Sequence, residues 1–237
     1  MKKHIPNLLT CCNIVLGTLS IMFAGKGYLN VAALLIIGAA TFDFLDGLVA
    51  RLLRVTSAIG ADLDSLADIV SFGVAPAAIF YVWMDFCFSN LSPELQFFPL
   101  TLLPYFAFLI VPFSAYRLAK FNHDERQQYE FYGLPTPANA FFIAFLPFAA
   151  DKLALLDNFW VLFGLSFIFS ILLVSDFPVF SLKFANYELK KNWIKYLFLL
   201  LSLILLGAFH LAAFPIIILL YILISLIKFG LTKVLHQ

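Results

Sequence analysis

Apolar residues form long runs along this chain, and short polar segments separate one run from the next. A helix needs about 20 mostly apolar residues to cross a bilayer. Eight runs meet this requirement and predict membrane-spanning helices over residues 6–24, 29–50, 63–88, 97–118, 137–156, 159–176, 194–210 and 212–230. Because these runs take up most of the chain, we expect an all-α fold, a polytopic transmembrane helix bundle with little outside the membrane.

The composition supports a membrane protein and excludes several other classes. Of the 237 residues, 63% are hydrophobic and 12% are charged, whereas a soluble domain has about 45–50% apolar and about 25% charged residues. A soluble enzyme, a disordered tail and a secreted disulfide scaffold are therefore poor interpretations. The net charge of +1 gives no electrostatic basis for binding nucleic acid.

Basic residues predict the orientation of the bundle. With eight spans, only Lys26 and Lys152 of the 15 Lys and Arg residues fall on the side opposite the N-terminus. Loops rich in Lys and Arg stay in the cytoplasm. We therefore expect both termini at the cytoplasmic face of the inner (cytoplasmic) membrane. The residues on that side are Lys2, Lys3, Arg51, Arg54, Arg117, Lys120, Arg126, Lys183, Lys190, Lys191, Lys195, Lys228 and Lys233.

The first apolar run has two interpretations. Two lysines followed by an apolar run are typical of a secretory signal peptide. Pro6, Asn7 and Asn13 interrupt the run, however, and counting it as a span preserves the asymmetry of the basic residues. These features favour an uncleaved first helix.

An acidic cluster is the most informative polar feature. Asp43 and Asp46 lie near the end of the second predicted helix, and Asp64 and Asp68 open the third. Their spacings, i and i+3 and then i and i+4, place each pair on one helix face. If the short loop between the helices lets them pack antiparallel, all four carboxylates meet near the cytoplasmic surface. Asp62 falls off the shared face and is better explained as a helix-capping residue.

Four neighbouring carboxylates indicate a site for divalent metal ions. Like charges so close together cannot all ionise unless cations compensate them. Oxygen ligands without His or Cys favour Mg²⁺ or Mn²⁺ over zinc, and two such ions about 4 Å apart can hold and activate phosphates. The alternative is that the aspartates cap two helices and pair with Arg51 and Arg54, which explains one or two of the acids but not four.

The spacing of this cluster matches a known signature. The chain reads D-F-L-D-G-L-V-A-R from Asp43, then eight residues, then G-A-D-L-D-S-L-A-D. This resembles the signature of the CDP-alcohol phosphotransferase family, D-x2-D-G-x2-A-R-x8-G-x3-D-x3-D. Every fixed position is present: Asp43, Asp46, Gly47, Ala50, Arg51, Gly60, Asp64 and Asp68.

Further segments narrow the resemblance to the membrane-integral bacterial and archaeal phosphatidylserine synthases of that family. They are P-N-L-L-T from Pro6, A-D-I-V-S-F-G-V-A-P-A from Ala67, Y-R-L-A-K-F-N from Tyr116, G-L-P-T-P-A-N from Gly133 and F-S-L-K-F from Phe180. Lys120 departs from the arginine of many relatives but keeps the charge. The resemblance divides the chain into a core over 1–185, with about six spans, and two additional helices over 186–237.

The resemblance also implies an activity and roles for residues. The activity is transfer of the phosphatidyl group from CDP-diacylglycerol to the hydroxyl of L-serine, with release of CMP, in a homodimeric enzyme. Asp43, Asp46 and Asp64 would hold one Mg²⁺ or Mn²⁺ ion, and Asp43, Asp64 and Asp68 would contact a second. Asp68 would also be the general base. The residues implied to border CDP-diacylglycerol are Asn7, Thr10, Gly47, Arg51 and Ser57.

The serine site is predicted from the end of the fourth span. Arg117, Lys120 and Asn122 lie at the same face as the aspartates, and Arg117 could bind the serine carboxylate through two hydrogen bonds. Alternatively, Arg117 and Lys120 only follow the positive-inside bias. Two other functions stay open: transfer to another alcohol, such as glycerol phosphate, inositol phosphate or choline, and cation transport through intramembrane acids.

Overall fold

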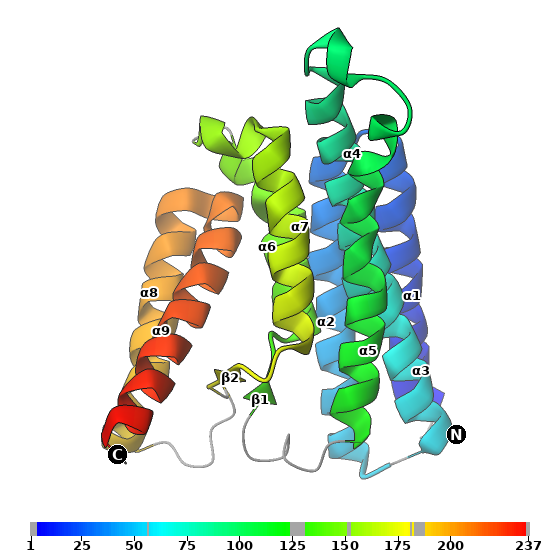
Figure 1. Cartoon of the computed structure of the whole chain (residues 1–237). Helices are drawn as coiled ribbons and strands as arrows, with labels where there is room; N and C mark the ends of the chain where they lie inside the picture. The colour runs from blue at the N-terminus through cyan, green and yellow to red at the C-terminus, as the bar shows by residue number, and fades with distance from the viewer. Residues whose placement is uncertain are drawn as a thin grey trace.

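The protein is a bundle of long helices with one small strand pair (Figure 1). The computed structural model describes residues 4–55, 57–123, 131–150, 153–180, 182 and 188–235. The first helix begins and the last helix ends at the same end of the bundle. The strand pair lies at this end as well, so several chain connections gather there.

The elements follow one another as up-and-down rods. The α-helices are α1 (His4–Gly25), α2 (Leu29–Leu53), α3 (Ala58–Asp68), α4 (Ala75–Ser89), α5 (Ile110–His123), α6 (Thr136–Ala150), α7 (Phe159–Val174), α8 (Leu189–Phe209) and α9 (Ala213–Leu235). A π-helical segment, η1 (Ile69–Val74), joins α3 to α4. The 3₁₀ segments are η2 (Pro93–Leu95), η3 (Leu100–Leu109), η5 (Ala154–Asp157) and η6 (His210–Ala212), and the strands are β1 (Phe131–Tyr132) and β2 (Pro178–Val179).

This arrangement confirms the predicted all-α membrane bundle. By length and composition, five described helical stretches could each cross a membrane: His4–Gly25, Leu29–Leu53, Ala58–Ser89, Leu100–His123 and Asn192–Phe229. The fifth stretch contains both α8 and α9, which turn at His210, and α6 and α7 are shorter apolar helices. Eight crossings therefore stay a prediction. Of the basic residues used to orient the bundle, Lys2, Lys3, Arg126, Lys152 and Lys183 lie outside the described residues.

The connection between the two aspartate helices is shorter than predicted. α2 continues to Leu53, where Arg54 adopts a left-handed conformation with φ 52° and ends the helix. α3 begins at Ala58, because the Ser57 side chain accepts a hydrogen bond from the Gly60 amide at 2.9 Å. Asp64 and Asp68 consequently lie in the second and third turns of α3 instead of opening the helix.

Prolines change two other predicted spans. The span over 97–118 contains η3 and the start of α5, and Pro104 lies inside η3. The span over 137–156 is α-helical only to Ala150, three residues after Pro147. Proline has no amide hydrogen to donate and its ring clashes with the preceding turn, so neither run forms one regular α-helix of the predicted length.

Polar side chains hold α1 against its neighbours. The Ser20 hydroxyl donates to the Ala32 carbonyl oxygen of α2 at 2.8 Å, and the Ser71 hydroxyl of η1 donates to the Asn13 carbonyl oxygen at 3.0 Å. Gly17 allows this close approach, since a Cβ atom there would overlap the Ser71 side chain and lie 2.9 Å from the Ser71 Cα. α2 and the η1 segment that follows α3 are therefore both hydrogen-bonded directly to α1.

Two apolar cores lie above the site. One joins α1, α2, α4 and α6 and includes Phe72, Ile79 and Phe145. The other core joins α4, α5, α6, α7 and α9, and it includes Phe80 and Phe159. Together they keep the helices from sliding past one another, so the aspartates on α2 and α3 stay in register.

The close contact at Gly17 yields a stability prediction. Gly17→Ala should lower the unfolding temperature in detergent, because α1 and η1 must separate and overpacking typically costs about 1–3 kcal/mol. Gly164→Ala is the matched control: nothing lies within 4 Å of a Cβ at that position of α7. The control should keep or slightly raise the unfolding temperature, since alanine is the better helix former. Equal unfolding temperatures for the two variants would contradict the close α1–η1 contact.

Candidate active site

Three of the four predicted carboxylates meet in one cluster. Asp43 of α2 and Asp64 and Asp68 of α3 each offer a carboxylate oxygen, and these oxygens all lie within 4.8 Å of one another. One oxygen of Asp64 and one of Asp68 are buried and accept no hydrogen bond from any residue that the structure describes. Asp62 is exposed, as its position off the shared face predicts. The helical spacing therefore brings together three of the four aspartates that the sequence indicated, and Asp46 is not part of this cluster.

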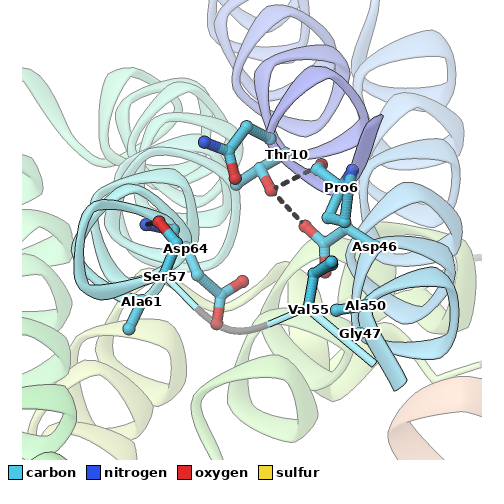
Figure 2. Close-up of a pocket in the computed structure, with 11 residues that line it drawn as sticks. Pro6, Thr10, Asp46, Gly47, Ala50, Val55, Ser57, Ala61 and Asp64 are labelled. Carbon is cyan, nitrogen blue, oxygen red and sulfur yellow. Dashed lines mark hydrogen bonds between the residues drawn. The ribbon is translucent and has the colours of Figure 1, made fainter. Parts of the chain in front are cut away.

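Asp46 lies one turn from Asp43 and has a partner of its own. It is 6% exposed, and the Thr10 hydroxyl lies 2.5 Å from its Oδ2. The same hydroxyl lies 3.1 Å from the Pro6 carbonyl oxygen. Figure 2 shows Asp46 and Asp64 pointing into the same space from opposite sides, with Thr10 above them. The first helix thus orients a carboxylate of the second.

The space between these side chains is a cavity of about 250 Å³. It opens between the start of α1, the end of α2 and the start of α3 (Figure 2). The lining residues are Pro6, Asn7, Thr10, Asp46, Gly47, Ala50, Val55, Ser57, Gly60, Ala61 and Asp64. Small residues on facing helices leave this volume empty, and the two carboxylates mark its inner end.

Four of the five residues implied to border CDP-diacylglycerol line this cavity: Asn7, Thr10, Gly47 and Ser57. The fifth, Arg51, is exposed on the last turn of α2 and does not line it. Its Nη1 would lie 3.8 Å from a Cβ at Gly47, so the guanidinium folds back along the helix toward the cavity. A long flexible cation at the mouth can still contact a phosphate that enters.

Arg117 is the only one of the three predicted serine-binding residues that is buried near the aspartates. It is 7% exposed, and its guanidinium interacts electrostatically with the Asp68 carboxylate. Its Nη1 donates to the Thr136 hydroxyl at 3.4 Å, and its Cζ lies 5.0 Å from the centroid of the Phe121 ring. Contacts on α5 and α6 therefore fix this cation beside Asp68.

Lys120 and Asn122 have different partners. The Lys120 ammonium forms an ion pair with Asp176 at 2.8 Å, and the Asn122 amide donates to the Ser65 hydroxyl at 2.9 Å. The first contact ties α5 to the segment before β2, and the second ties α5 to α3. Both residues thus hold the end of α5 in place in this structure.

A deeper layer of polar side chains was not predicted. One turn from Arg117 and Thr136 lie Ser114 and Asn139, both fully buried. The Ser114 hydroxyl and both polar atoms of the Asn139 side chain have no hydrogen-bond partner within the described structure. Asn139 belongs to the segment G-L-P-T-P-A-N that the sequence singled out, but only the packing of α6 against α5 shows which way it faces.

The carboxylate cluster fits a divalent cation. Buried carboxylate oxygens without hydrogen bonds are costly unless a positive charge compensates them. Carboxylates are the ligands that Mg²⁺ and Mn²⁺ prefer, and no His or Cys belongs to the cluster formed by the described residues. Asp43, Asp64 and Asp68 can therefore hold a metal ion beside the cavity, which Asp64 lines.

Comparisons with known proteins agree with this site. The family model described as CDP-alcohol phosphatidyltransferase matches residues 3–175. The chain is 33% identical over 202 residues to the CDP-diacylglycerol–serine O-phosphatidyltransferase of Helicobacter pylori (strain ATCC 700392 / 26695), covering 84% of this chain and 79% of that protein.

Two further relatives come from other lineages. The enzyme of the same name from Mycobacterium bovis is 37% identical over 186 residues, covering 74% of this chain and 60% of that protein. The archaetidylserine synthase of Methanothermobacter thermautotrophicus is 36% identical over 138 residues, covering 57% of this chain and 54% of that protein. Because the family model spans most of the chain and includes all four aspartates, this protein belongs to the CDP-alcohol phosphatidyltransferase family.

Proposed function

We propose that this membrane protein transfers the phosphatidyl group of CDP-diacylglycerol to the hydroxyl of L-serine, giving phosphatidylserine and CMP. Membership of the family supports the donor. The relatives support the acceptor, because all three are named for serine or a serine product. Transfer to glycerol phosphate, inositol phosphate or choline is the alternative within the same family. Cation transport, the other alternative, gives no role to the cavity beside Gly47 and Ala50.

One observation carries the assignment of roles: members of the aspartate group adjoin the cavity and Arg117. Asp46 and Asp64 line the cavity, while Asp68, one turn further along α3, interacts with the Arg117 guanidinium. A donor in the cavity and an acceptor at Arg117 would therefore approach the carboxylates from two sides. That is the arrangement an in-line displacement at phosphorus requires.

On the donor side, the nucleotide lies in the cavity between α1, α2 and α3. Gly47 and Gly60 leave room for it, and Asn7, Thr10 and Ser57 border it. Arg51 contacts its phosphates from the mouth. Asp43, Asp46 and Asp64 would hold one divalent ion, and Asp43, Asp64 and Asp68 would contact a second. When bound, these ions neutralise the negative charge that develops on the pyrophosphate.

On the acceptor side, Asp68 acts as the general base. A serine hydroxyl hardly ionises at neutral pH, so its attack requires a proton acceptor within hydrogen-bond reach. As the serine oxygen bonds to the phosphorus of the phosphatidyl group, its proton passes to Asp68 and the bond from that phosphorus to the CMP oxygen breaks. Arg117 holds the serine carboxylate through paired hydrogen bonds.

The proposal also includes the setting of the enzyme. From the distribution of Lys and Arg we infer that both termini and the site lie at the cytoplasmic face of the inner membrane, with eight crossings. The core over 1–185 carries the site, and two copies form a homodimer, as the family resemblance implies. The acyl chains lie in the bilayer while serine comes from the cytoplasm.

The metal requirement is the first test. Excess EDTA should abolish CMP release from CDP-diacylglycerol and serine, because the clustered carboxylates would otherwise repel one another and the donor phosphates. Mg²⁺ or Mn²⁺ should restore it. Activity that persists after dialysis against EDTA, in protein shown by elemental analysis to be metal-free, would contradict the metal assignment.

Asp68→Asn tests the general base. It keeps the shape of the side chain but removes the proton acceptor, so kcat should fall about 10²- to 10⁴-fold. Binding of CDP-diacylglycerol should be affected much less. Asp62→Asn is the matched control on the exposed face of the same helix and should keep normal activity. A kcat close to that of the unmodified enzyme in Asp68→Asn would remove this residue from the role.

Arg117→Lys tests the serine site. Lysine keeps the charge but cannot form the paired contact, so the KM for serine should rise roughly 10- to 150-fold, equivalent to about 1.5–3 kcal/mol. The KM for CDP-diacylglycerol should change little. Arg54→Lys, at an exposed position outside the cavity, is the control. If the two KM values of Arg117→Lys rise together, the arginine binds phosphate instead of serine.

A further inference from the structure

The last two helices lie outside the part of the chain that matches the family model, which ends at residue 175. α8 and α9 form a hairpin that turns at η6. In Figure 1 this hairpin stands beside α6, and β2 lies next to its lower part. α9 contacts both α6 and β2. The hairpin therefore meets the core at the same end of the bundle as the active site.

Two side chains of α9 bind the backbone that follows β2. The Tyr221 hydroxyl donates to the Phe180 carbonyl oxygen at 2.8 Å. The Phe180 amide donates to the Ser225 hydroxyl at 3.4 Å, and that hydroxyl donates to the Tyr221 carbonyl oxygen at 2.8 Å. Tyr221 is 6% exposed, and its ring lies 4.8 Å from that of Phe180. Both polar groups of the Phe180 backbone thus depend on side chains one turn apart on α9.

Backbone contacts connect the segment that α9 binds to the segment that leads into Thr136. β2 pairs with β1, with Phe131 opposite Val179. Beyond β1, the Gly133 amide donates to the Phe177 carbonyl oxygen at 2.8 Å. Gly133 has φ +79°, a conformation that other residues rarely adopt. Three residues later, Thr136 accepts the hydrogen bond from Arg117.

A second connection reaches α5 from the same segment. Asp176, two residues before β2, forms the ion pair with Lys120, one turn from Arg117. The segment that α9 binds is thus joined to α5, one turn from Arg117, as well as to the turn before Thr136.

We propose that Tyr221 is a positioning residue for Arg117. By binding Phe180, its hydroxyl fixes the strand pair and the Gly133 turn that hold Thr136 under the guanidinium. The proposal rests on the proposed function, in which Arg117 binds the serine carboxylate. It gives the C-terminal hairpin a role in acceptor binding, although the hairpin carries none of the motif residues.

Tyr221→Phe tests the proposal, because it removes one hydroxyl and keeps the ring. The KM for serine should rise about 3- to 10-fold, the effect expected from losing one buried hydrogen bond. The KM for CDP-diacylglycerol should stay within twofold of normal. Tyr28→Phe is the matched control, since Tyr28 is 59% exposed at the turn between α1 and α2. It should change neither KM.

The double variant separates positioning from general stability. If Tyr221 acts through Arg117, adding Tyr221→Phe to Arg117→Lys should raise the serine KM by less than twofold further. An unchanged serine KM in Tyr221→Phe, beside a raised one in Arg117→Lys, would overturn the role of Tyr221 and leave the serine site intact. The role would also be overturned if Tyr221→Phe raised the serine KM as much in the double variant as it does alone. A parallel rise of the serine and CDP-diacylglycerol KM values in Tyr221→Phe would overturn it too. A neutral Arg117→Lys would instead remove the serine site and, with it, the role of Tyr221.

Discussion

Repulsion among the carboxylates of Asp43, Asp64 and Asp68 is the constraint on which the rest of the structure depends. Removing a charged carboxylate from water is costly unless it is compensated, and the oxygens of these three lie within 4.8 Å of one another. The remaining features of this end of the bundle compensate that charge or hold it in place. The tight turn at Arg54, the cap at Ser57 and the close contact between Gly17 and Ser71 leave the two helices little freedom to move apart.

Arg117 is a buried positive charge, and neighbouring groups compensate it as well. A guanidinium that is 7% exposed in an apolar bundle loses much of its hydration. Thr136 accepts one of its hydrogen bonds, Phe121 offers the face of its ring, and Asp68 supplies negative charge. Five N–H donors exceed the acceptors that these partners provide. In the proposed complex, the serine carboxylate would accept further hydrogen bonds from this guanidinium.

The features that depend on local residue spacing could be predicted from the sequence. Helical periodicity placed Asp43 with Asp46 and Asp64 with Asp68, and the run lengths located the helical rods. The positions of Thr136 and Asp176 could not be predicted in the same way. Their partners, Arg117 and Lys120, lie 19 and 56 residues away along the chain, and only tertiary packing brings them together.

Backbone irregularities were equally hard to predict. The π-helical segment from Ile69 to Val74 directly follows Asp68, and its residues form an ordinary apolar run in the sequence. The strand pair has only two residues on each side, too few for an alternating pattern to be recognised. In both cases, contacts with other helices determine the local conformation, because the sequence of the segment alone is compatible with more than one.

The two sides of the aspartate cluster differ in their access to water, and this difference bears on the chemistry. The cavity side is open, with exposed Ala61 at its edge. On the other side, Arg117 and its partner Thr136 are both buried. Water competes with serine for the phosphatidyl group, and its attack would hydrolyse the lipid donor. In the proposed mechanism, Asp68 is the base and one of its oxygens is buried. An amino acid held by Arg117 would reach this base more readily than bulk water, which would favour transfer over hydrolysis.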